Sequence, residues 1–223
     1  LTAVVTVGDD GGSSGRLRQE LEILPPGDLR MALASLCDES DWGLTWRDLM
    51  QHRFQTDGAL NGHALGNLLI TGLWQMFEDP VEGLDWVGRL LKAHGRVLPM
   101  SLAPLLIEAT VEEEGVITAV RGQTAVATVG KLISEVRLFP EDPPVPSEVV
   151  TAIHDAEWVV LGPGSWYTSV LPHVLVPDIH QALATTEAHR ALIVNLARQE
   201  GETEMLSTAD HVRVLHEAAP DLK

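Results

Sequence analysis

The chain has 223 residues, of which 45% are hydrophobic, so it can bury a substantial core and is not expected to be mainly disordered. Its net charge of −17 repels polyanions and argues against nucleic acid or an anionic membrane surface as a partner. The single cysteine, Cys37, excludes an internal disulfide framework, and no apolar run approaches the ~20 residues of a membrane span, which together predict a cytoplasmic protein.

The predicted elements begin with a short apolar, β-branched strand at residues 2–7. A strand as first element, without a preceding Met, predicts that the natural chain has an earlier segment. The pattern then becomes helical from residue 16 to residue 94, and Gly- and Pro-containing turns divide it into four or five helices. The clearest helix is expected from Gly62 to Phe77, with Asn61 able to cap its start.

In the second half, the spacing at residues 97–139 changes to short β-like runs, which predict a small sheet or insertion. Strands are expected at 157–161 and 191–196, and helices at 147–155, 178–188 and 207–218. Because apolar strands alternate with helices, the sequence predicts the α/β fold class, with a parallel sheet covered by helices on both faces.

The first segment that could carry chemistry is Gly8 to Gly15, GDDGGSSG, which follows a strand and precedes a helix. Gly11 and Gly12 allow backbone N–H groups to approach a phosphate, Ser13 and Ser14 add hydroxyl donors, and the helix start supplies positive potential. This pattern predicts a phosphate-binding turn. A surface turn whose glycines only satisfy backbone geometry is the alternative that the residues leave open.

Charged residues surround this turn. Asp9 and Asp10 are poor neighbours for a bare phosphate, so they predict a bridging Mg²⁺, a bound ligand hydroxyl or a proton acceptor. Arg16, Arg18 and Arg30 flank the Gly- and Pro-rich loops and mark where a small anion could bind on an otherwise acidic chain.

Two further segments fit the same kind of site. The second loop, at residues 162–169, follows a predicted strand in the way that the first does, and parallel strand ends converge, so a nucleotide or phosphate site is predicted there. The third segment, GHALGN, places His63 and Asn67 one helical turn apart. For the second loop the candidate ligand-binding residues are Gly162, Gly164, Ser165, Tyr167, Thr168 and Ser169.

Six motifs in order along the chain resemble the YvcK/CofD-like family, and more closely its gluconeogenesis factor branch. These are TVGDDGGSSGRLR (6–18), PPGDLR (25–30), GHALGN (62–67), GRVLP (95–99), GPGSWYTSVLP (162–172) and NLARQEGET (195–203). The resemblance implies a Rossmann-like core and a single CofD-type domain over residues 1–223, with the insertion at about 97–140. It also implies a further strand and Gly-rich loop upstream of Leu1.

For function, the resemblance implies a cytoplasmic protein that binds nucleotide-diphosphate sugars such as UDP-N-acetylglucosamine and supports growth and cell shape on gluconeogenic carbon sources. The other branch contains 2-phospho-L-lactate transferases that use Mg²⁺, so a transferase is the alternative, and a scaffold with a vestigial site is a third. Parallel sheets with apolar edge helices often dimerise, so a homodimer is one expected state.

Motif positions assign the site residues that the resemblance implies. The phosphate and metal end would comprise Asp9, Asp10, Gly11, Gly12, Ser13 and Asp28. Within it, Asp9 and Asp10 are the candidate catalytic residues, and Asp10 and Asp28 the candidate Mg²⁺ ligands. Sugar or base contacts are expected from Asn67, Asn195 and Gln199.

Overall fold

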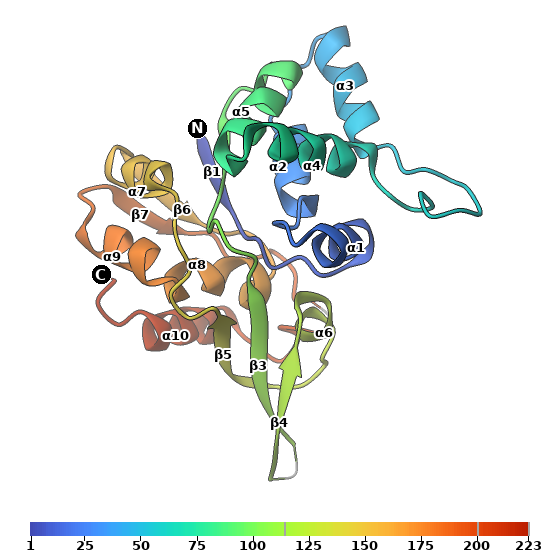
Figure 1. Ribbon diagram of the computed structural model, residues 1–223. Coiled ribbons are helices and arrows are strands. Elements are labelled where there is room, and N and C mark those ends of the chain that lie inside the picture. The colour runs from blue at the N-terminus through green and yellow to red at the C-terminus, as the bar shows by residue number, and fades with distance from the viewer. Residues whose placement is uncertain (114, 200, 223) are drawn as a thin grey trace. The chain divides into compact units, whose positions relative to one another are not determined.

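The computed structural model describes residues 1–113, 115–199 and 201–222 (Figure 1). It divides into two compact units, Leu1–Pro104 and Leu105–Lys223, each of which is described by itself. Both units contain helices together with strands, and two strand pairs are parallel, which confirms the predicted α/β class. The expectation of one domain with an insertion at about 97–140 stays a prediction.

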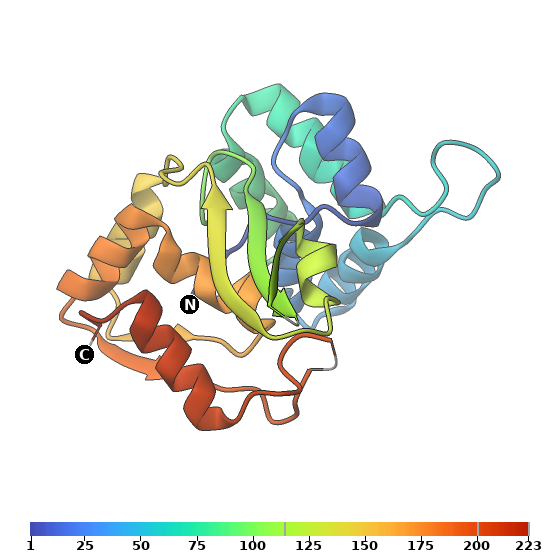
Figure 2. The ribbon, with the colours of Figure 1, turned by 90° about the horizontal axis from the view of Figure 1, so that it is seen from below.

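The first unit is built on a pair of parallel strands with helices packed around it. Strand β1 (Thr2–Val5) pairs with β2 (Arg96–Pro99), and Thr2 lies opposite Arg96. The helices between these strands are α1 (Gly12–Leu21), α2 (Gly27–Ser35), α3 (Asp41–Gln51), α4 (Leu65–Phe77) and α5 (Pro80–Leu91). Figures 1 and 2 both show the segment between α3 and α4 extending away from the helices. Residues 55–61 of that segment are exposed.

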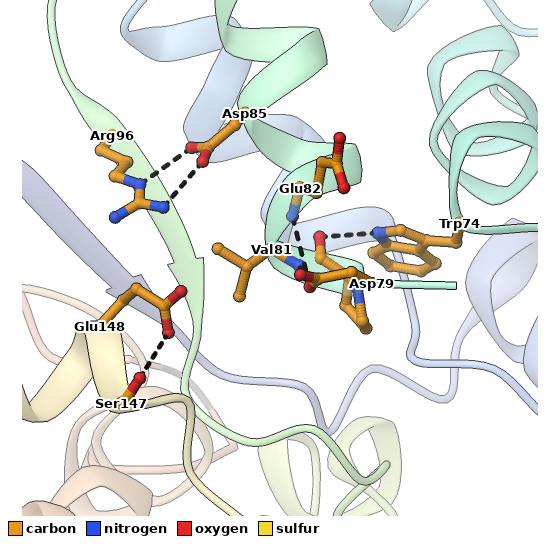
Figure 3. Close-up of polar contacts among 9 residues, drawn as sticks. Trp74, Asp79, Val81, Glu82, Asp85, Arg96, Ser147 and Glu148 are labelled. Carbon is orange, nitrogen blue, oxygen red and sulfur yellow. Dashed lines mark hydrogen bonds and ion pairs between the residues drawn. The ribbon is translucent and has the colours of Figure 1, made fainter. Parts of the chain in front are cut away.

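Helix α5 shows how local sequence sets an element of this unit (Figure 3). The Asp79 carboxylate accepts hydrogen bonds from the backbone N–H groups of Val81 and Glu82, at 2.8 and 3.4 Å, and caps the helix start. The ion pair between Asp85 and Arg96, with N–O distances of 2.9 and 2.7 Å, ties α5 to β2. The apolar face of α5 is buried in the core and consists of Val81, Leu84, Val87 and Leu91. Each such side chain contributes about 1.5–3 kcal/mol through burial.

The second unit contains a three-stranded antiparallel sheet and a second parallel pair. The antiparallel sheet has the order β4 (Val116–Arg121), β3 (Leu106–Glu113), β5 (Ile133–Phe139), with helix α6 (Gln123–Ala127) between β4 and β5 (Figure 2). Strand β6 (Trp158–Leu161) pairs in parallel with β7 (His189–Leu192). The other helical elements are α7 (Ser147–His154), the π-helical turn η1 (Trp166–Val170), α8 (Leu171–Leu175), α9 (Pro177–Thr185) and α10 (Thr208–Ala218).

Several predicted boundaries are wrong by a few residues. The helix expected from Gly62 begins at Leu65, because Gly62 has a φ of +75°, outside the helical region, and Ala64 takes the N-cap position in place of Asn61. The strand expected at 191–196 is β7, which ends at Leu192. Among the described helices, none is both long and apolar enough to cross a bilayer.

Candidate functional site

The Gly-rich turn after β1 places the start of helix α1 next to the start of helix α2. The Asp9 carboxylate accepts a hydrogen bond from the Gly11 N–H at 3.0 Å. A Cβ built on Gly27, the first residue of α2, would lie 2.3 Å from Asp9 Oδ2 and 2.4 Å from Ser14 Oγ. Asp9 and Ser14 therefore abut the backbone of α2, and only glycine fits at position 27.

The N-termini of α1 and α2 both lack a side-chain cap. No side chain caps α1 at Gly11 or α2 at Pro26, in a part of the chain that is fully described. The first N–H groups of a helix have no intrahelical partner and carry positive potential, which favours an anion. A Cβ on Gly12, which has a φ of +43°, would meet no protein atom within 4 Å. The turn is therefore open on the side of Gly12.

Behind the turn, Ser13 is the centre of a buried hydrogen-bond network. Its Oγ lies 2.9 Å from His63 Nδ1, 3.3 Å from the Ala64 backbone nitrogen and 3.1 Å from Asn67 Nδ2. Ser14 Oγ lies 3.4 Å from the same Asn67 nitrogen. The predicted residues Ser13, Ser14, His63 and Asn67 are thus brought together, and all four are buried.

The donors in this network determine the tautomer of His63. The Ala64 N–H and the Asn67 amide both donate to Ser13 Oγ, so the Ser13 hydroxyl hydrogen is directed to His63 Nδ1, which must be the unprotonated ring nitrogen. Burial lowers the pKa of His63, Arg16 lowers it further, and Glu20 partly opposes these effects. His63 is therefore a neutral hydrogen-bond acceptor near neutral pH.

Arg30 extends the network from α2 to α3. Its Nε donates to Asn67 Oδ1 at 2.8 Å, and its Nη1 donates to Gln51 Oε1. The side chain is 3% exposed, and burial lowers the pKa of Arg30, with Arg53 acting in the same direction and Asp9 and Asp28 opposing it. The structure thus holds a buried guanidinium close to the turn that carries Asp9.

Arg16 has a different position from Arg30. It is exposed, and its guanidinium donates to the backbone oxygens of Ala59 and Asn61, at 3.1 and 2.7 Å. These bonds attach the extended segment before α4 to helix α1. Arg16 therefore connects two parts of the first unit. Burial lowers the pKa of Arg18, and the nearby Asp10 and Asp9 carboxylates oppose this only in part.

The predicted metal ligands Asp10 and Asp28 are exposed and half-buried, respectively. Throughout the described residues, no three His, Cys, Asp or Glu side chains lie close enough to hold a metal ion. Mg²⁺ is commonly held by one or two carboxylates together with ligand phosphates. A pair of carboxylates is compatible with Mg²⁺ that arrives with a phosphorylated ligand, and these assignments stay predictions.

The second loop follows β6 in the other unit and is fixed by backbone contacts. A Cβ on Gly162, which has a φ of +79°, would lie 2.5 Å from the Ile193 carbonyl oxygen. Asn195 accepts from the Gly164 N–H at 3.1 Å and donates to the Gly164 carbonyl at 2.8 Å, and it also donates to Gln199 Oε1 at 3.0 Å. Asn195 therefore holds the loop directly and Gln199 supports it.

Two of the four hydroxyl-bearing residues of the second loop are buried. Tyr167 and Thr168 are each 2% exposed, Ser165 and Ser169 are half-buried, and the Ser165 and Thr168 hydroxyls bond to each other. Burial raises the pKa of Tyr167 to about 12, and Glu202 and Asp210 contribute to the shift. The expectation that this loop and the Gly8–Gly15 turn converge on one ligand stays a prediction.

Sequence reasoning missed Gln51 and Glu202. Gln51 is the last residue of α3 and accepts from Arg30, a contact that no local pattern could indicate. Glu202 lies within the NLARQEGET motif, whose resemblance implies no role for it. Its buried carboxylate accepts from Ser165 Oγ at 2.6 Å and from the Tyr167 N–H at 2.9 Å.

Comparisons with known proteins agree with the motif order. The family model described as "2-phospho-L-lactate transferase CofD" matches residues 1–221. The "Putative gluconeogenesis factor" of Mycobacterium tuberculosis is 52% identical over 99% of this chain, and the chain spans 66% of that relative's length. The "Gluconeogenesis factor" of Bacillus subtilis is 40% identical, with 97% of this chain and 67% of the relative covered.

A solved structure supports the same grouping. The crystal structure of a Bacillus halodurans protein superposes with a TM-score of 0.90 at 39% identity, over 99% of this chain and 70% of that one. The chain thus spans about two thirds of the curated relatives that it matches. Because the family model covers nearly every residue, the chain belongs to the CofD family, within the group of sequences named gluconeogenesis factors.

Proposed function

We propose that this protein binds a nucleotide-diphosphate sugar of the UDP-N-acetylglucosamine type at the Gly8–Gly15 turn. It would do so as a regulatory protein of the gluconeogenesis factor type, which supports growth and cell shape on gluconeogenic carbon sources. The observation that supports this most is the pair of helix starts without side-chain caps, at Gly11 and Pro26, with the buried Arg30 nearby.

The chemistry of this turn suits a diphosphate. Backbone N–H groups at the start of α1 can donate to phosphate oxygens, and the absence of a side chain at Gly12 allows close approach. Arg30 adds a positive charge in a low-dielectric environment, where it counts for more than on the surface. On a chain with a net charge of −17, attraction for an anion would have to be local, and the helix starts and Arg30 would supply it.

Asp9 and Asp10 fit this proposal in different ways. Asp9 accepts from Gly11 and lies against Gly27, so its role is to hold the turn. Asp10, together with Asp28, would hold Mg²⁺ that arrives with the diphosphate, and the ion would neutralise phosphate charge. This assignment predicts that Asp10→Asn weakens binding in the presence of Mg²⁺ and has little effect in its absence.

Calorimetric titration with UDP-N-acetylglucosamine, with and without Mg²⁺, tests the proposal. The wild type should bind saturably, and Gly12→Ala should bind at least about tenfold more weakly, a loss of about 1.4 kcal/mol. Gly130→Ala is the matched control, because Gly130 also has a positive φ, of +63°, and a Cβ on it would also meet nothing within 4 Å. Failure of the wild type to bind any UDP-sugar would overturn the proposal.

The family description favours a second candidate, a transferase that moves a phosphorus-linked group from a nucleotide diphosphate donor. The same titration with GDP and Mg²⁺, followed by an assay for consumption of a GDP-linked donor, separates the two. Preference for the guanosine nucleotide together with donor consumption would establish the transferase. Binding of UDP-N-acetylglucosamine without any turnover would establish the regulatory protein.

A further inference from the structure

Several hydrogen-bond donors at the start of η1 converge on one carboxylate. Glu202 Oε1 accepts from Ser165 Oγ at 2.6 Å and from the Tyr167 backbone N–H at 2.9 Å, and the Thr168 backbone also donates to this side chain. The Glu202 side chain lies in the interior, at 7% exposure. A hydroxyl and two successive N–H groups that point to one position form the kind of donor set that binds anions in proteins.

The segment that carries Glu202 is attached to the second loop at another point as well. The Asn195 amide bonds to both the N–H and the carbonyl of Gly164, and Gly162 packs against the Ile193 carbonyl with no room for a side chain. The segment that carries Glu202 is therefore anchored to the second loop at Gly164 as well as through the Glu202 carboxylate.

The surroundings of Glu202 act on its charge in opposite directions. Burial is the largest influence and raises the pKa of Glu202, and the bonds from Ser165 and Tyr167 and the nearby His211 partly offset this rise. His211 donates from Nδ1 to the Ser207 carbonyl at 2.8 Å, and its ring lies against Trp166. Asp210 also lies near this cluster and contributes to the raised pKa of Tyr167.

We propose that Glu202 is a built-in anion that occupies the donors of residues 165–168 and so excludes ligand phosphate from the second loop. The sequence pattern suggests two equivalent phosphate-binding loops, but this carboxylate makes them different. This proposal rests on the proposed function. The diphosphate then binds only at the Gly8–Gly15 turn, and Glu202 is a positioning residue that keeps it out of the second loop. Removing its charge should create an anion site that the wild type lacks.

The test is titration with inorganic pyrophosphate, followed by NMR of the Tyr167 and Thr168 backbone amides. In the wild type these two amides should not respond. In Glu202→Gln and Glu202→Ala they should shift in a saturable way, because a carboxylate, whose charge-assisted hydrogen bonds are about twice as strong as neutral ones, no longer competes for them. The control is Glu204→Ala, which removes an exposed carboxylate two residues away and should behave as the wild type does.

Glu202→Gln keeps the size of the side chain and an acceptor oxygen, so it decides the test if Glu202→Ala does not fold. A response of these amides in the wild type would overturn the proposal, because the donors would then be open. A folded Glu202→Gln protein whose amides ignore pyrophosphate would overturn it as well. The proposed function is tested separately, by UDP-sugar binding at Gly12, so failure of one can be told from failure of the other.

Discussion

Replacement of Ser13 by alanine tests the buried network behind the Gly-rich turn. The change removes three hydrogen bonds at once and leaves the Ala64 N–H, the Asn67 amide and His63 Nδ1 without the Ser13 oxygen. A hydrogen bond contributes about 0.5–1.5 kcal/mol net, and a buried group left without a partner costs about 1–3 kcal/mol. Since Asn67 retains its contact at 3.4 Å with Ser14, we expect a total loss of about 2–4 kcal/mol in the free energy of unfolding.

Urea unfolding followed by tryptophan fluorescence measures this loss, since the chain contains six Trp. Ser35→Ala is the control, because Ser35 is exposed and its hydroxyl donates to the Met31 carbonyl of its own helix. We expect the control to lie within about 0.5 kcal/mol of the wild type. If Ser13→Ala matched that control, the network would not stabilise the protein and the description of the site would be refuted.

Three further predictions concern charge and backbone. The pKa of His63 in the folded protein lies below its usual 6.5, so the unfolded chain takes up the proton first as the pH falls. The contribution of neutral His63 to stability is therefore fully present above pH 6.5 and is lost as the pH falls below that value. Urea midpoints measured against pH should show that His63→Gln removes this part of the pH dependence. Gly162→Ala should lower the free energy of unfolding by at least about 2 kcal/mol, because the new Cβ meets the Ile193 carbonyl. Gly72→Ala in α4 should instead raise the free energy of unfolding by about 0.5–1 kcal/mol. Equal effects of the two changes in thermal melts would contradict this. Tyr167 is the single tyrosine, so phenolate absorbance should remain absent in the folded protein well above pH 10.0, and titration with an ordinary midpoint would show that this side chain is not buried.

Local patterns predicted most elements of the fold, but residues 97–139, expected to consist of β-like runs, also contain helix α6 at Gln123–Ala127. The β-branched run after Leu1 and the apolar run at Trp158 became β1 and β6, and each is followed by a Gly-rich loop as expected. The helix starts were less predictable. Asn61 is a good capping residue by type, but the positive φ of Gly62 and the long segment before α4 delay the helix to Leu65.

The contacts within the candidate site depend on positions far apart in sequence. Ser13 and His63 are 50 residues apart, and Arg30 and Gln51 are 21 apart, so no local spacing could show that they bond. Ser13 was expected to face a ligand phosphate, but its hydroxyl is used by three protein groups. The residue types that bind phosphate and those that build a buried polar network are the same, and only the packing tells them apart.

The central claim is that the Gly8–Gly15 turn receives the diphosphate of a nucleotide sugar. The most direct measurement is an NMR titration of the isotope-labelled protein with UDP-N-acetylglucosamine, in which the backbone amides from Gly11 to Ser14 are followed individually. The claim predicts that these amides show the largest saturable shifts, while the Tyr167 and Thr168 amides do not bind phosphate. Saturable binding that leaves the amides from Gly11 to Ser14 unmoved would contradict it.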